Sequence, residues 1–258
     1  MRLMKRILSA AAVLALSASL LVGCSSGTAC SVPVSASSAA ESTVSSVEET
    51  ASSAVDENEA AAAQLLNDLT GSYQELWPVI LADEYKQTWL DDCTALVGED
   101  NAEAAFEKLS SMVTGDVYGE DAVKAYANGG GAYFCGFTNS LAILTFDGET
   151  STISGTDKDG NVLFSHTYHY IGMEPVRGLY EFQSDDADSG EFTYFFLAPD
   201  TSAETYHIEF RYGSDADALS QYDAGDYAYW LASGISTDCD QTMIDNCIEL
   251  FCTENLAG

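Results

Sequence analysis

Residues 150–171 read TSTISGTDKDGNVLFSHTYHYI. Two runs rich in β-branched and aromatic residues, Thr150–Thr156 and Val162–Ile171, flank the segment Lys158-Asp159-Gly160-Asn161. An Asp-Gly pair between two such runs is a strong sign of a tight turn between antiparallel strands. The segment therefore predicts a β-hairpin.

The same pattern recurs on both sides of this hairpin. Leu141–Phe146 and Gly178–Gln183 read as strands, and Phe192–Leu197 and Thr205–Tyr212 flank the turn-like Ala198-Pro199-Asp200. Short strands joined by hairpins are typical of an antiparallel barrel. The fold class is predicted to be mostly β with flanking helices.

Helical patterns lie at the two ends of this β region. We expect a helix over Asn58–Leu69, short helices broken near Pro78 within Ser72–Leu90, and a helix over Asn101–Val113. Two further segments read as helical: a short one over Tyr118–Tyr126 and a terminal one over Asp240–Cys252, with Asp238 as a candidate N-cap.

The N-terminus has the pattern of an export signal. Three basic residues, at positions 2, 5 and 6, precede the apolar run Ile7–Leu21. Leu21-Val22-Gly23-Cys24 then looks like a lipobox, so residues 1–23 are predicted to be a lipoprotein signal peptide and Cys24 the lipidated residue. The expected location is the outer face of the cell membrane, held by lipid alone. The alternative is an ordinary signal peptide with an incidental cysteine.

Composition divides the remaining chain in two. Residues 24–60 are rich in Ser, Ala and Glu, and they include no aromatic residue. Such a segment buries too little apolar surface to offset its ordering entropy, so we predict a disordered tether there. Residues 61–258 contain all 14 Tyr, 3 Trp and 11 Phe, enough for one folded domain.

The charge is strongly acidic. The chain has 9 Lys and Arg against 41 Asp and Glu, and three of the basic residues lie in the predicted signal peptide, which leaves 6 − 41 = −35. This argues against nucleic acid as a partner. It favours the approach of cations, although acidity that serves only solubility is the simpler interpretation.

Six cysteines remain besides Cys24, at positions 30, 93, 135, 239, 247 and 252. An even number in an exported chain allows three disulfides in any of about fifteen connectivities, or reduced thiols in an anaerobe. The spacing of Cys239, Cys247 and Cys252 is not that of a zinc knuckle. The acidic loop 185–191 only partly resembles a calcium-binding loop. No catalytic motif is found, so an enzyme is not expected.

Thr205–Tyr212 alternates strictly between apolar and polar residues. One face of the predicted strand has Tyr206, Ile208 and Phe210, and the other has His207 and Glu209. The polar face of a half-buried strand usually lies in water, so an exposed histidine is the simplest interpretation of His207. A ligand for a metal ion is the alternative.

Several short segments, in order, resemble the ZinT (YodA) family of extracytoplasmic metal-binding proteins. They occur at residues 69–73, 121–126, 157–163, 176–182, 195–199 and 206–208, within residues 66–252. The resemblance implies a calycin- or lipocalin-like antiparallel β-barrel with N-terminal helices and a C-terminal helix. It also implies zinc or cadmium bound by three histidines at one end of the barrel.

The family's metal ligands transfer only in part to this chain. The second member of its His-x-His pair matches His207, whereas the first falls on Thr205 and the third on Phe195. The remaining candidates are His207 and Glu209, with His166 or His169 able to complete a rebuilt site for zinc or another divalent cation. His166 and His169 are an odd number of residues apart, so they cannot share one face of a strand.

Two functions follow as hypotheses. The first is a lipid-anchored protein that binds a divalent metal and delivers it to a membrane transporter. The second is a calycin-like module that has lost the metal site and binds a small molecule in an aromatic pocket near Phe195.

Overall fold

The computed structural model describes residues 45–113, 133–198 and 207–256. The chain divides into two compact units, Met1–Val44 and Ser45–Gly258, and all described residues belong to the second. The predicted signal peptide, Cys24 and Cys30 lie outside the described residues, as do residues 118–126. None of the described helices is long and apolar enough to cross a membrane.

Eight strands of the described chain form a closed antiparallel barrel in sequence order, with β8 returning to pair with β1. This confirms the predicted calycin-like barrel with helices before and after it. The strands are β1 Gly71–Glu75, β2 Ile143–Asp147, β3 Thr152–Thr156, β4 Val162–Met173, β5 Tyr180–Ser184, β6 Tyr194–Leu197, β7 Ile208–Gly213 and β8 Ala232–Ser236.

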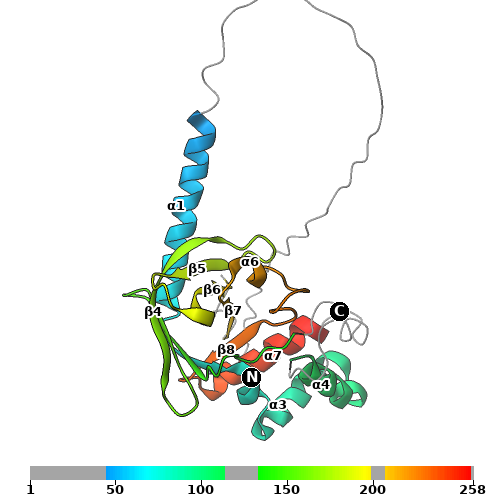
Figure 1. The fold of residues 1–258 in the computed structure, drawn as a ribbon. Coiled ribbons are helices and arrows are strands. Elements are labelled where there is room, and N and C mark those ends of the chain that lie inside the picture. Colours follow the sequence, from blue (N-terminus) through cyan, green and yellow to red (C-terminus); the bar gives the residue numbers. More distant parts are fainter. Residues whose placement is uncertain (1–44, 114–132, 199–206, 257–258) are drawn as a thin grey trace, which may run out of the picture. The chain divides into compact units, whose positions relative to one another are not determined.

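Helices precede, interrupt and follow the barrel. They are α1 Ser45–Asp68, α2 Leu76–Ile80, η1 Asp83–Tyr85, α3 Lys86–Val97, α4 Glu99–Val113, η2 Gly190–Phe192, α6 Ala216–Leu219 and α7 Gln241–Leu256. Helices α3, α4 and α7 group on one side of the barrel, whereas α1 extends from the side where β4 lies (Figure 1).

The predicted hairpin is confirmed as β3 and β4. The turn between them is closed by Asp157, whose Oδ1 accepts the backbone N–H groups of Asp159 and Asn161, both at 2.9 Å. Gly160 has φ +81°, a conformation that a side chain would strain. The β6–β7 pair is also confirmed, with Phe195 opposite Tyr212 and Leu197 opposite Phe210.

Two apolar cores hold the domain together. The first fills the barrel with inward side chains of the strands. The last turn of α1 adds Leu65 and Leu66 to it, and the residue after the helix adds Leu69. The second lies outside the barrel, where α2, α3, α4 and α7 bury Trp89 and Leu109 against Ile235 of β8. The outer face of β8 is therefore covered by helices.

Three elements differ from the sequence expectation. Helix α1 begins at Ser45 rather than Asn58, so the last part of the segment predicted as a disordered tether is helical. A composition too polar to form a core still allows a helix rich in Ala and Glu. The short helices expected within Ser72–Leu90 are present as α2, η1 and the start of α3, but Pro78 lies inside α2 instead of breaking it, and residues 71–75 form strand β1 because β2 and β8 both pair with them.

Strand β8 was not predicted, because its sequence ASGIS has no alternating pattern. Its small residues are required by the neighbours: a Cβ on Gly234 would lie 3.0 Å from Cγ1 of Ile208. The cap of α7 is also shifted. Asp240, and not Asp238, accepts the Met243 N–H at 2.9 Å.

The five cysteines described are free thiols, and two of them face each other across the helical core. The Sγ atoms of Cys93 on α3 and Cys252 on α7 lie 3.9 Å apart, and both residues are fully buried. A disulfide requires an S–S distance of about 2.0 Å, so the two sulfur atoms must move closer before a bond can form.

We expect Cys93 and Cys252 to join when the protein refolds with oxidised glutathione, which accepts the two electrons and two protons of the thiols. The bond should raise the free energy of unfolding in urea by about 2–4 kcal/mol. Peptide mapping under non-reducing conditions would identify the pair. The Cys93→Ala variant should lose both the bond and the gain; a bond mainly between other cysteines would contradict the prediction.

Candidate functional site

Strand β7 has the predicted alternation. Ile208, Phe210 and Tyr212 point into the barrel core and are fully buried. The polar face, with His207, Glu209 and Arg211, lies on the outside of the barrel, and all three residues are at least partly buried. Arg211 is 0% exposed. The interpretation of His207 as an exposed strand histidine is therefore wrong, because other elements cover this face of the strand.

Arg211 attaches the connection between β7 and β8 to the barrel. Its guanidinium donates to the backbone carbonyls of Leu219 and Tyr227 and lies 4.4 Å from the ring centre of Tyr222. Buried guanidinium groups need such partners, since an unpaired buried charge is costly. The role of Arg211 is thus structural.

His207 lies at the start of the same face, beside α7. Its Nε2 is 3.8 Å from Oε1 of Glu209, and Cys247 of α7 lies near enough to act on the ring. The His207 side chain is 17% exposed and that of Glu209 is 43% exposed. The structure therefore brings the predicted pair together and adds Cys247. The sequence contained no sign of this contact, because Cys247 belongs to a helix forty residues further along the chain.

The surroundings of His207 favour a proton on its ring. Burial lowers the pKa of the ring, but the hydrogen bonds to Cys247 and Glu209 and the charges of these two groups raise it, and the net result is a pKa of about 11. The ring of His207 thus holds a proton next to Glu209 and Cys247, and a bound cation could take the place of that proton.

Cys135 is another cysteine whose thiol responds to the charge of Glu209, but it is a poor metal ligand. Burial, with a smaller contribution from the Glu209 charge, raises the pKa of its thiol to about 12. Its Sγ donates to the carbonyl oxygen of Tyr133 at 3.3 Å. Because the thiolate is the form that binds metal, Cys135 is inert near neutral pH.

Phe195 does not join His207. It is 0% exposed inside the barrel, where its ring centre lies 5.4 Å from that of Tyr212 and 5.4 Å from that of Tyr168. His207 is on the opposite face of the sheet, so Phe195 and His207 cannot contribute to one metal site. Thr205 and Glu204 lie outside the described residues. The rings around Phe195 also fill the lumen, which argues against the expected ligand pocket there.

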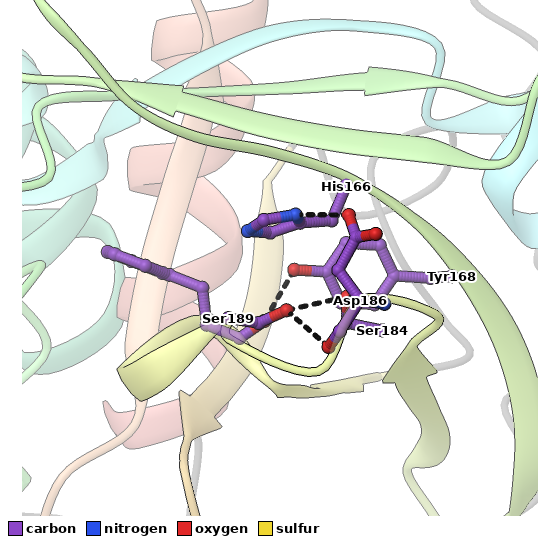
Figure 2. Close-up of polar contacts among 6 residues, drawn as sticks. His166, Tyr168, Ser184, Asp186 and Ser189 are labelled. Atoms are coloured by element: carbon purple, nitrogen blue, oxygen red, sulfur yellow. Dashed lines mark hydrogen bonds and ion pairs between the residues drawn. The ribbon is translucent and has the colours of Figure 1, made fainter.

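A second polar cluster lies between β4 and the loop after β5 (Figure 2). Nδ1 of His166 is 2.6 Å from Oδ2 of Asp186, and the Ser189 hydroxyl donates to Ser184 Oγ at 2.8 Å or to the Asp186 carbonyl at 3.0 Å. The Tyr168 hydroxyl donates to the Phe192 carbonyl at 2.5 Å. These contacts hold the loop to the strand.

Two carboxylates of the acidic loop 185–191 therefore pair with histidines of β4. His169, on the other face of β4, has its Nδ1 2.7 Å from Oδ1 of Asp185, so the two adjacent carboxylates diverge to opposite faces of the strand. Neither His166 nor His169 is paired with His207. Within residues 45–113, 133–198 and 207–256, no three His, Cys, Asp or Glu side chains form a group that could hold a metal ion.

Comparisons with known proteins give similarity in structure only. No protein-family model and no curated protein sequence matches the chain. The Zn(II)-bound ZinT-like domain of Streptococcus pneumoniae AdcA is similar at 15% identity and a TM-score of 0.45, over 71% of this chain and 89% of that domain. Zn(II)-bound AdcA from Streptococcus pneumoniae is similar at 14% identity and a TM-score of 0.41, over 75% of this chain and 35% of AdcA.

The position of Phe195 leads to a direct prediction. The Phe195→His variant should not gain zinc affinity, because its ring would enter the apolar lumen on the far side of the sheet from His207. Loss of ring packing and burial of a polar ring should lower the free energy of unfolding by about 2–5 kcal/mol. Urea unfolding and zinc titration calorimetry measure the two effects. A tenfold gain in zinc affinity would show that our placement of the two residues is wrong.

Proposed function

We propose that this domain binds a divalent cation of the zinc type at His207 and Glu209, with Cys247 as the third donor. The observation that supports the proposal is that Nε2 of His207 lies 3.8 Å from Oε1 of Glu209 and that Cys247 acts on the same ring from α7. Nitrogen, oxygen and sulfur from these three side chains are the donors that zinc prefers.

The distances require only a small rearrangement. Two atoms bound tetrahedrally to one zinc ion at about 2.0–2.2 Å lie about 3.3–3.5 Å apart. Nε2 of His207 and Oε1 of Glu209 are 3.8 Å apart, which rotation of the half-exposed Glu209 side chain can shorten. The Cys247 thiol must turn toward the same point, since the three groups are not assembled around a centre in this conformation.

The chemistry of binding is a replacement of protons. The ion would displace the proton that Glu209 and Cys247 help to retain on His207. The formal charge of −32 for the whole chain attracts cations to the surface and disfavours anionic competitors. The alternative of a small molecule inside the lumen is less favoured, because aromatic rings occupy that space around Phe195.

We further propose that the protein is anchored by lipid on Cys24 outside the cell membrane and delivers its ion to a membrane transporter. The basic residues before the apolar run Ile7–Leu21, followed by Gly23 and Cys24, support this. An ion held by only three protein donors leaves a coordination position open for transfer to a partner. The proposal assigns no catalytic step.

Zinc binding by the purified domain should depend on His207. We expect His207→Ala to weaken zinc binding on the order of 100-fold in titration calorimetry, and Cys247→Ser to weaken it less, because the closer pair of donors, His207 and Glu209, remains in that variant. His169→Ala is the matched control, since it removes an exposed histidine from another strand. Equal loss in both histidine variants would overturn the assignment.

The pH dependence of the same titration separates this site from loose binding to surface carboxylates. With the pKa of His207 at about 11, its ring is protonated near neutral pH, so zinc must displace that proton. Affinity should rise about tenfold or more for each pH unit between about pH 6 and pH 8. Surface carboxylates are already ionised in this range. A flat profile would contradict the His207 site.

Anchoring can be tested in cells. The Cys24→Ser variant should move from the membrane fraction to the soluble exported fraction, because it lacks the thiol that carries the lipid. Cys30→Ser, which removes a cysteine a few residues later, should remain in the membrane fraction. Membrane retention of Cys24→Ser would exclude lipid on this residue as the anchor.

A further inference from the structure

A hollow of about 490 Å³ lies away from His207, between residues 134–139 and the connection before β8. Four aromatic residues and two carboxylates contribute to its lining: Phe134, Tyr227, Tyr229, Trp230, Glu191 and Asp226. Its volume falls in the range of pockets for small organic ligands. The metal site proposed above uses none of these residues.

The aromatic walls are held in place by backbone contacts. The Phe134 N–H donates to the Tyr229 carbonyl at 2.9 Å, and the Leu231 N–H donates to the Phe134 carbonyl at 3.1 Å. The Trp230 indole donates to the Gly136 carbonyl at 2.8 Å. These bonds join residues about ninety positions apart and hold Phe134 beside Tyr229 and Trp230.

The carboxylate of Glu191 is oriented by two hydroxyl groups. Its Oε1 accepts from Ser214 at 3.1 Å, and its Oε2 accepts from Tyr227 at 3.0 Å. Each carboxylate oxygen has a second lone-pair direction, which remains free to accept from a ligand. Glu191 is half-buried and Asp226 is exposed at the rim. None of the Lys and Arg residues in the described chain lines the hollow.

The backbone at the pocket is in an uncommon conformation. Tyr229 has φ +54° and Asn139 has φ +53°, and for Tyr this left-handed conformation is unusual. The Tyr229 N–H donates to the Tyr222 carbonyl at 2.8 Å, which holds the residue in place. Such residues are concentrated at ligand-binding sites, where the rest of the structure compensates for their cost.

We infer that this hollow binds a small organic cation, an amine or quaternary ammonium group that is attached to an apolar body. Aromatic faces attract such cations, and the oriented Glu191 carboxylate would pair with the charge. The apolar body would contact the rings of Phe134 and Trp230. An anionic ligand would meet two carboxylates without a basic partner, and a bare metal ion would find too few donors among the rings.

Three probes of similar size separate charge from shape: 2-phenylethylammonium, neutral 2-phenylethanol and anionic 3-phenylpropionate. In ligand-observed NMR with the purified domain, we expect the cation to bind about tenfold or more tightly than the alcohol, and the anion not to bind. Equal affinity for the cation and the alcohol, or no binding of the cation up to about 10 mM, would overturn the inference.

Variants locate the binding site. Glu191→Gln should weaken binding of 2-phenylethylammonium by about tenfold while keeping hydrogen-bonding groups for Ser214 and Tyr227. Tyr229→Leu should weaken it by removing the aromatic face. Glu103→Gln, on the exposed side of α4, removes the same charge far from the hollow and should have no effect. An equal loss of affinity for 2-phenylethylammonium in Glu103→Gln would contradict binding at the hollow. An unchanged affinity for this probe in His207→Ala would show that the hollow is independent of the metal site.

Discussion

Aromatic rings packed inside the closed barrel occupy the lumen and so limit where this domain can bind a ligand. All eight strands pair on both sides, and their inward residues form one continuous core with the end of α1. Phe195, Phe210 and Tyr212 leave no space in their part of the lumen. Polar side chains instead gather on the outer face of the sheet, in the connections between strands, and where His166 and Tyr168 of β4 meet the loop after β5.

The outer face of β7 is where helices and loops cover polar residues. At one end of the strand His207 meets Glu209 and the Cys247 thiol of α7, and near the other end Arg211 is buried beneath the connection to β8. Two charged residues on the same face of β7 thus have different roles. Arg211 has carbonyl partners and stabilises the fold, whereas His207 has acidic partners and can exchange a proton for a cation.

The local signals in the sequence predicted much of the fold. The hairpin around Gly160, the pair β6–β7 and the helix α4 form close to the expected positions, because turn residues and alternation act over a few residues. Strand β8 could not be predicted. Its small residues have no pattern of their own, and it is a strand because β1 and β7 provide hydrogen bonds on both sides.

The sequence by itself determined the hairpins of the sheet, the acidic charge and the alternation that places His207 and Glu209 on one face, whereas closure of the barrel by β1 and β8 depends on tertiary pairing. Tertiary structure alone decided that Phe195 lies on the opposite face, that Cys247 reaches His207, and that Glu191 joins four aromatic residues around a hollow. Alternation within a strand is a property of neighbouring residues. Contacts between distant segments depend on strand register and on helix packing, which no short segment of this chain encodes.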